Sequence, residues 1–187
     1  MLTLVIARHG ETTHNAAGRY QGHCDAPLTA AGIAQAHALA ERIAPLISQD
    51  DVRYVSSDLG RALATAAIAL PGRAIRSDRR LRETHFGRFD GQTHDECLHC
   101  DGVAYRAWLE DPIANAIPEG ESFDSLEARV LSWLDEQPRH GITVAITHGG
   151  PAFILMSRLL HISFAAARRI GLEHGASVRL TLEETGV

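Results

Sequence analysis

Two histidines of this 187-residue chain directly follow short apolar runs that are typical of buried strands. His9 comes just after the run Leu2–Ala7, with one arginine between them, and His148 comes just after Thr143–Thr147. In a doubly wound sheet, ligands bind beyond the carboxyl ends of the strands, near the point where the strand order reverses. If the two runs form neighbouring strands, the sequence predicts a pair of imidazoles that face each other in one crevice.

Two arginines are expected at the same edge of the sheet. Arg8 adjoins the first histidine, and Arg61 lies in the first turn of a helix that follows a third apolar run, Val52–Ser56. Guanidinium groups match the oxygens of phosphate bidentately, so this set would suit a dianion such as phosphate. One such residue alone is most often a surface or capping group. Four independent placements at one edge favour a shared ligand.

The elements that would position these side chains alternate along the chain between strand and helix. Further short strands are expected at about Ala74–Ser77 and Val178–Leu182. Helices are expected from Thr29 to about Ser48, from Ser57 or Asp58 to Leu70, over Ser122–Glu136, and after Gly149-Gly150-Pro151. The apolar face of the first helix would consist of Ile33, Ala36, Ala40, Ile43 and Ile47. The inward face of the third would consist of Phe123, Leu126, Val130, Leu131 and Leu134. This alternation predicts an α/β fold: a three-layer, doubly wound, mostly parallel sheet with helices on both faces.

The stretch from about 85 to 118 interrupts that alternation and has no clear strand. We interpret it as a small cap-like insertion in a single domain that covers residues 1–187. It contains four residues of metal-ligating type, His94, Cys97, His99 and Cys100. The two cysteines have the spacing of a zinc-ligand pair, but the sequence offers no second pair. We therefore expect no metal, and a zinc site is the alternative that elemental analysis would decide.

Composition removes several classes of function. The chain has eighteen arginines and no lysine, which excludes Schiff-base chemistry, pyridoxal phosphate attachment and a lysine-bearing P-loop. A formal net charge of −5 disfavours a nucleic-acid partner. No run approaches the roughly 18 apolar residues of a membrane span, and no basic leader precedes the first strand. The three cysteines are an odd set, so we expect no disulfide framework and a cytoplasmic location.

A basic cluster precedes Glu83 in the chain and consists of Arg73, Arg76, Arg79, Arg80 and Arg82. These charges could attract anionic substrates toward the crevice. The alternative is a solvated loop whose arginines pair with acidic neighbours, and we favour this second interpretation.

Six blocks of residues follow one another in an order that one protein family shares. The first is Arg8-His9-Gly10-Glu11-Thr12 with Asn15, and the last is Thr147-His148-Gly149-Gly150. Between them come the blocks 18–36, 56–66, 81–91 and 120–122. Together they resemble the histidine phosphatase superfamily, in its phosphoglycerate mutase-like branch, over the whole length of the chain. Phe89 and Asp90 stand where tryptophan and glutamate are usual, a departure that we expect to affect local packing and not chemistry.

The resemblance implies a mechanism and a role for each site residue. His9 would attack phosphorus and become a phosphohistidine, which requires a neutral ring whose other nitrogen donates to a carbonyl. Glu83 would protonate the leaving alkoxide and then deprotonate the attacking water. Arg8, Asn15, Arg61 and His148 would bind the phosphoryl oxygens. Because arginines supply the charge, neither a metal nor another cofactor is expected.

Both phosphatases and mutases belong to this family. The mutases are longer, with a C-terminal tail that closes the site, whereas this chain ends in the acidic stretch Glu183–Val187. We therefore expect a phosphomonoesterase that acts on a small phosphorylated metabolite, with α-ribazole phosphate, sugar phosphates, cofactor precursors and phosphohistidine proteins all open as substrates. A cofactor-dependent phosphoglycerate mutase and a non-catalytic phosphate-binding module are the alternatives. Relatives are often dimers, so a homodimer is an option that the sequence leaves undecided.

Overall fold

The central strand of the molecule buries apolar side chains on both of its faces. In β1 (Leu2–Arg8), Leu4 and Ile6 belong to one core cluster, while Val5 and Ala7 belong to another. Successive side chains on a strand point to opposite faces, so an unbroken apolar run requires cover on both sides of the sheet.

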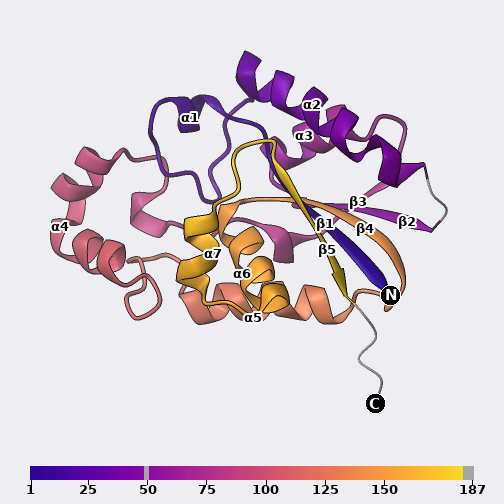
Figure 1. Cartoon of the computed structure of the whole chain (residues 1–187). Helices are drawn as coiled ribbons and strands as arrows, with labels where there is room; N and C mark the ends of the chain where they lie inside the picture. Colours follow the sequence, from indigo (N-terminus) through magenta and orange to yellow (C-terminus); the bar gives the residue numbers. More distant parts are fainter. Residues whose placement is uncertain (49–50, 183–187) are drawn as a thin grey trace.

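The strands lie in the order β3-β2-β4-β1-β5 in the part of the chain that the computed structural model describes, residues 1–48 and 51–182 (Figure 1). Besides β1 they are β2 (Val52–Ser56), β3 (Ile75–Ser77), β4 (Gly141–Thr147) and β5 (Ser177–Leu182). Neighbouring strands are parallel except for β1 and β5, which are antiparallel. Arg8 pairs with Thr147, so the carboxyl ends of β1 and β4 lie side by side, as predicted.

Helices cover both faces of the sheet and confirm the predicted three-layer, doubly wound α/β fold (Figure 1). On one face lie α2 (Ala30–Ile47) and α3 (Gly60–Ala69), and on the other lie α5 (Phe123–Asp135), α6 (Gly149–Leu160) and α7 (Phe164–Ile170). The connections contain the short helix α1 (Thr13–Ala16) and the 3-10 turns η1 (Arg79–Leu81) and η2 (Gly87–Phe89). Thr29 caps α2, as the sequence indicates.

α3 begins later than predicted, and a distant residue caps it. Neither Ser57 nor Asp58 is its N-cap, because the helix starts at Gly60 and the residue before it makes no side-chain cap. The Asp25 carboxylate instead accepts the amide hydrogens of the first two helical residues. Such a cap depends on tertiary contact between two loops, and local sequence does not reveal it.

The buried faces of α2 and α5 differ at single positions from those predicted. In α2 the fully buried residues include Leu39, whereas Ile33 is exposed. Gly32, Ala36, Leu39 and Ile43 form the buried stripe, with spacings of four, three and four that match the helical period. In α5 the buried set includes Trp133, a residue that the expected apolar face left out.

The segment 85–118 has no strand, in line with the prediction, but it contains a helix that the sequence reading missed. α4 (His94–Glu110) begins with a capping box at Thr93 and is kinked at Asp101. It lies to one side of the sheet (Figure 1). Phe89, Cys97, Tyr105 and Ile117 form a small core there, separate from the two clusters on the sheet. That the segment is a cap within one domain stays a prediction.

Helix lengths also bear on the expected lack of a membrane span. Within residues 1–48 and 51–182, no single helix is both long and apolar enough to cross a membrane. α6 and α7 meet the length and composition criteria only when they are taken together, as a pair bent by 113°.

Candidate active site

His9 lies at the end of β1 with its two ring nitrogens in different environments. Its side chain is buried, and Nδ1 lies 2.7 Å from the carbonyl oxygen of Gly10. Arg61 Nε donates to His9 Nε2 across 3.3 Å. Burial, followed by the charge of Arg61, lowers the pKa of His9 well below its ordinary value. The ring is therefore neutral, with a proton on Nδ1 and a lone pair on Nε2, the form that a nucleophile requires.

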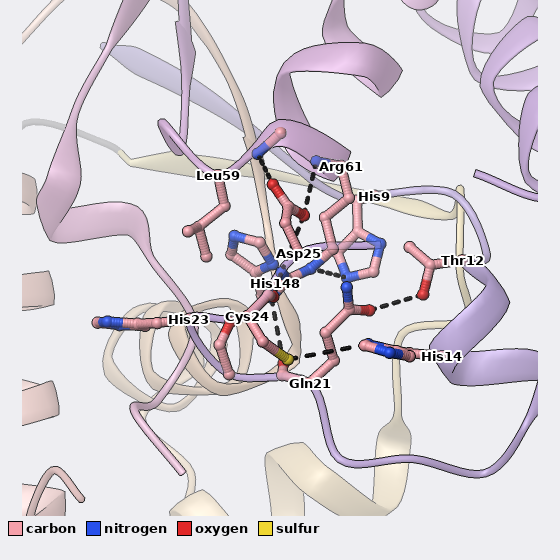
Figure 2. Close-up of polar contacts among 12 residues, drawn as sticks. His9, Thr12, His14, Gln21, His23, Cys24, Asp25, Leu59, Arg61 and His148 are labelled. Atoms are coloured by element: carbon pink, nitrogen blue, oxygen red, sulfur yellow. Dashed lines mark hydrogen bonds and ion pairs between the residues drawn. The ribbon is translucent and has the colours of Figure 1, made fainter. Parts of the chain in front are cut away.

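His148 follows β4 and is fully buried beside the first histidine. The two ring centroids are 5.0 Å apart, because β1 and β4 are adjacent and in register (Figure 2). His148 Nε2 lies 2.8 Å from the Ser57 hydroxyl, whereas Nδ1 has no hydrogen-bond partner among the described residues. Burial and then the charge of Arg61 hold the pKa of His148 well below its ordinary value. If Nε2 accepts the hydroxyl proton, Nδ1–H is an unused donor.

Arg61 is a fully buried guanidinium that backbone carbonyls hold in place. Its Nη atoms donate to the carbonyl oxygens of Gln21, Gly22 and Cys24 at 3.1, 2.8 and 3.0 Å. The nearest carboxylate oxygen, on Asp25, is 3.5 Å away and belongs to a partly exposed side chain. Burial lowers the pKa of Arg61, and Glu83 and Asp25 act in the opposite direction. The closest oxygen partners of Arg61 are therefore neutral carbonyls, and its one ion pair, with Asp25, is longer.

Asp90 orders the loop that supplies those carbonyls. Its carboxylate accepts the amide hydrogens of Gly22, His23 and Cys24 at 2.7, 2.9 and 2.9 Å. The sequence reading limited this residue to local packing. The structure adds that this packing reaches the site, because the loop that Asp90 holds supplies carbonyls to Arg61.

Glu83 and Arg8 flank the start of α6. Glu83 is 9% exposed, and its carboxylate accepts the amide hydrogens of Thr84 at 2.8 Å and of Gly150 at 3.1 Å. A side-chain carbon placed on Gly149 would lie 3.6 Å from Glu83 Oε2 and 3.8 Å from Arg8 Cζ. A similar carbon on Gly150 would collide with the Glu83 carboxylate, so the glycine pair leaves room for the acid.

Arg8, like Arg61, makes its hydrogen bond to a carbonyl. Its Nη1 donates to Leu172 O at 3.0 Å, and its Nε is buried without a partner among the described residues. Burial lowers the pKa of Arg8, with Glu83 and Glu173 acting against it. This cation is therefore also free to bind an anion.

Asn15 is tied into the first turn of α1 rather than directly to the other site residues. Its side-chain oxygen accepts the Thr12 amide hydrogen at 3.1 Å as part of a capping box. The Thr12 hydroxyl lies 2.6 Å from Gln21 Oε1, so Asn15 joins the site through two intervening side chains. Its predicted contact with the phosphoryl group stays a prediction.

Two further residues of the site escaped the sequence reading as binding groups. Gln21 is buried, extends toward His9, and has an Nε2 with no partner among the described residues (Figure 2). His174 stacks at 5.4 Å from His9, and burial lowers its pKa to about 4. The block that resembles the family contains Gln21, so that signal was present, whereas no local pattern marks His174.

The carboxyl ends of β1 and β4 thus lie among hydrogen-bond donors and positive charge. Arg8 Nε, Gln21 Nε2 and His148 Nδ1 are all buried without partners among the residues that the structure describes, and the closest hydrogen bonds of the two guanidinium groups to oxygen go to carbonyls. Buried donors are normally satisfied, so such a group of exceptions indicates a site for an anion. With a neutral histidine and the buried side chain of Glu83 nearby, the arrangement has the parts of a phosphoryl-transfer site.

The four residues of metal-ligating type on α4 have separate surroundings. Cys97 is buried in the small core and Cys100 is exposed. His94 Nδ1 lies 2.8 Å from the Tyr105 hydroxyl, and His99 Nδ1 lies 2.7 Å from a backbone carbonyl. Nowhere in the described ranges do three histidine, cysteine or acidic side chains form a group that could hold a metal ion.

Two of the five arginines of the basic cluster pair with acidic neighbours, as that interpretation expects. Arg80 pairs with Asp78 and Glu136, at 2.8 and 2.7 Å, and Arg82 pairs with Asp58 at 2.6 Å. Arg73 lies over the ring of Tyr54, with its guanidinium carbon 5.7 Å from the ring centre.

Comparison with known proteins agrees with this fold and site. A family model described as the histidine phosphatase superfamily (branch 1) matches residues 4–187. A probable phosphoglycerate mutase (GpmB) of Yersinia pestis is 35% identical over 190 residues, which cover 99% of this chain and 87% of the relative. The α-ribazole phosphatase of Shigella flexneri superposes with a TM-score of 0.86 at 28% identity, covering 97% and 91% of the two chains. A mycobacterial glucosyl-3-phosphoglycerate phosphatase, solved with VO3, gives 0.79 at 33% identity, with 96% and 92% covered.

The fold and the comparisons together define the class as an α/β enzyme of the phosphatase and mutase type. The chain belongs to the histidine phosphatase superfamily, branch 1.

Proposed function

We propose that this protein is a phosphomonoesterase that hydrolyses a small phosphate ester through a phosphohistidine on His9. One observation carries the proposal: the Nε2 atom of a neutral His9 lies against Arg61, and the closest hydrogen bonds of both Arg61 and Arg8 to oxygen go to neutral carbonyls. Phosphoryl transfer needs mainly positioning and positive charge around the equatorial oxygens, and both are present here.

The first step transfers the phosphoryl group to the enzyme. Arg8, Arg61, His148 and Gln21 donate to the phosphoryl oxygens, and Asn15 assists. His9 Nε2 attacks phosphorus while the bond to the ester oxygen breaks, and Gly10 O accepts from Nδ1–H as positive charge builds on the ring. The electron pair leaves with the ester oxygen, which takes a proton from Glu83.

The second step returns the enzyme to its starting form. Glu83, now a carboxylate, removes a proton from a water molecule as that water attacks phosphorus. The bond between phosphorus and Nε2 breaks, its electron pair returns to the ring, and inorganic phosphate leaves. No metal ion takes part, because the two guanidinium groups supply the charge.

Phosphoglycerate mutase is the second candidate, because the Yersinia relative carries that name. A mutase must also bind a second phosphoryl group, which calls for further free cations. In the described part of the chain, several arginines outside the site pair with acids instead. These are Arg19 with Glu96, Arg82 with Asp58, Arg88 with Glu119, and Arg129 with Glu121. The acidic stretch 183–187 lies outside the described residues, so hydrolysis rests on these pairs.

The substrate that we propose is a small phosphate monoester of an alcohol. The names of the structural relatives point to α-ribazole phosphate and to a phosphorylated sugar derivative as first choices. Both classes share the phosphoryl group that the cleft would bind, and differ in the alcohol.

Phosphate release from a panel of such esters tests the proposal, in the presence of a metal chelator. His9→Ala should lower kcat by about 10⁴-fold or more, since the nucleophile is lost. His37→Ala, on the exposed side of α2, should behave as the wild type. Rapid quenching followed by mass spectrometry should find a phosphoryl group on His9.

Three results would contradict the proposal. Equal activity of His9→Ala and the wild type would reject the nucleophile, and a lack of activity on every ester would favour a non-catalytic module. Interconversion of 3- and 2-phosphoglycerate faster than phosphate release would favour the mutase.

A further inference from the structure

Glu83 is a buried acid on a segment without regular secondary structure. It lies between the 3-10 turns η1 and η2, and its carboxylate is positioned against the first turn of α6. A carboxyl group that transfers protons must be held to within a fraction of an ångström of its productive position. A backbone without helix or strand bonds cannot supply that precision alone, so the surrounding contacts must do so.

Arg129 of α5 supplies contacts to the carbonyls on and before Glu83. Its Nη1 donates to Arg80 O and Arg82 O, both at 2.7 Å, and its Nη2 donates to Glu83 O at 3.0 Å. The helix that carries it is anchored in the core by Leu126, Val130 and Trp133. One rigid side chain therefore binds three carbonyls of the acid's own segment.

Glu121 completes the arrangement on the other side of the acid. Its carboxylate accepts from Arg129 Nε and Nη2 at 2.6 and 2.8 Å. Its backbone amide donates to His85 O at 2.9 Å. The ion pair is mostly buried, with side-chain exposures of 19% and 14%. Residues before and after Glu83 are thus tied to the same pair, which we name the clamp.

We propose that Arg129, oriented by Glu121, is the positioning residue for the general acid Glu83, an inference that rests on the proposed phosphatase function. This role requires a planar guanidinium, because the Arg129 side chain donates five hydrogen bonds at fixed angles. Lysine has a single nitrogen and cannot bind the carboxylate bidentately while reaching three carbonyls.

The leaving group of the substrate separates positioning from mere stability. An alkyl ester releases a strongly basic oxygen that needs the proton from Glu83, whereas p-nitrophenyl phosphate releases a weakly basic oxygen that can depart without it. Both esters share the second step, in which Glu83 is the base, so the comparison uses kcat/KM, which reports formation of the phosphoenzyme alone. Arg129→Met should therefore lower kcat/KM by about 10²-fold on glycerol phosphate and by less than about 3-fold on p-nitrophenyl phosphate. Arg129→Lys and Glu121→Gln should show the same selectivity to a smaller extent.

Arg80→Met is the matched control. Arg80 also joins α5 to this region, through Glu136, but its side chain binds carboxylates and none of the carbonyls next to the acid. Arg80→Met should lower kcat/KM only slightly, and by the same factor on both substrates. Thermal unfolding of each variant records stability alongside the rates. If Arg129→Met fails to fold, Arg129→Lys and Glu121→Gln decide the question by the same ratio of rates.

A double-mutant cycle gives the second readout. In a Glu83→Gln background the acid is absent, so adding Arg129→Met should change the rate on glycerol phosphate by less than about 2-fold. Equal losses of kcat/KM on both substrates, or a full effect of Arg129→Met in the Glu83→Gln background, would overturn the clamp. Failure of the proposed function is distinct, since the wild type itself would then release no phosphate or His9→Ala would match it.

Discussion

The arginines of the cleft and those of the basic cluster differ in what holds them. Backbone carbonyls accept the closest hydrogen bonds of Arg8 and Arg61 to oxygen; Arg61 is buried and Arg8 is half-buried. Carboxylates accept those of Arg80 and Arg82, whose side chains are each 25% exposed. The two sets belong to one chain and have the same side-chain chemistry.

The difference teaches how a protein keeps a guanidinium available. A carbonyl orients the group without cancelling its charge, whereas a carboxylate does both. The pKa values follow this division: burial lowers the pKa of Arg61, while the hydrogen bond from Arg82 to Asp58 raises the pKa of Arg82. A dianion gains most from a cation that has no other counter-charge, so the cleft and not the cluster is suited to phosphate.

Removing one arginine from each set gives the largest contrast. Arg61→Met should reduce kcat/KM for phosphate esters by about 10³-fold, because a buried donor to the phosphoryl group is lost. Arg82→Met should stay within about 3-fold, since its partner is an acid near the surface. Steady-state rates with one ester decide the matter. Comparable losses in the two variants would show that the choice of partner does not separate the sets.

A carboxylate added next to Arg61 should pair with it, as carboxylates pair with Arg80 and Arg82 in the basic cluster. Gln21→Glu keeps the size of the side chain but places an acid beside Arg61 and His9, where Gln21 extends (Figure 2). We expect a loss of about 10²-fold in kcat/KM, mainly through KM, because the acid would repel the dianion. Gln92→Glu, in the segment 85–118, is the control that adds the same charge elsewhere. A normal KM for Gln21→Glu would contradict the role assigned to uncompensated charge.

The smallest expected effect concerns the free energy of unfolding, which should depend on pH through the histidines that lie near Arg8 and Arg61. His174 has a pKa of about 4 in the folded protein, through burial and then the charge of Arg8, against an ordinary value of 6.5. Below about pH 6.5 the unfolded chain binds a proton that the folded chain refuses, so this stability is present above pH 6.5 and is lost as the pH falls to about 4. His9 and His148 act in the same direction.

Thermal unfolding at pH 7 and pH 4 measures that trace. Between pH 7 and pH 4, the Tm of His174→Gln should fall by roughly 3 °C less than the Tm of the wild type. His37→Gln, which removes an exposed histidine of α2, should lose as much as the wild type. A His174→Gln curve parallel to that of the wild type would show that the surroundings of His174 do not depress its proton affinity.

Much of the fold could be predicted because its signals are local. Short apolar runs marked β1, β2 and β4. His9 and His148 lie just beyond two of these runs, which predicted that the two imidazoles lie close together. The cap of α3 could not be predicted, because Asp25 reaches it from another loop. α4 escaped notice because its polar and apolar residues are spread around a kinked helix.

The amino-acid sequence by itself determined which chemistry this protein could perform: strand ends carrying histidine and arginine, a chain without lysine, and motif blocks that identify a family. Only the tertiary structure decided which cations stay available and how the acid is held. Those properties depend on partners far apart in the chain, such as Arg61 with the loop that Asp90 orders, or Arg129 with Glu83. Hydrogen bonds and buried charge act across space, so they arise when the chain folds and are not written in any local pattern.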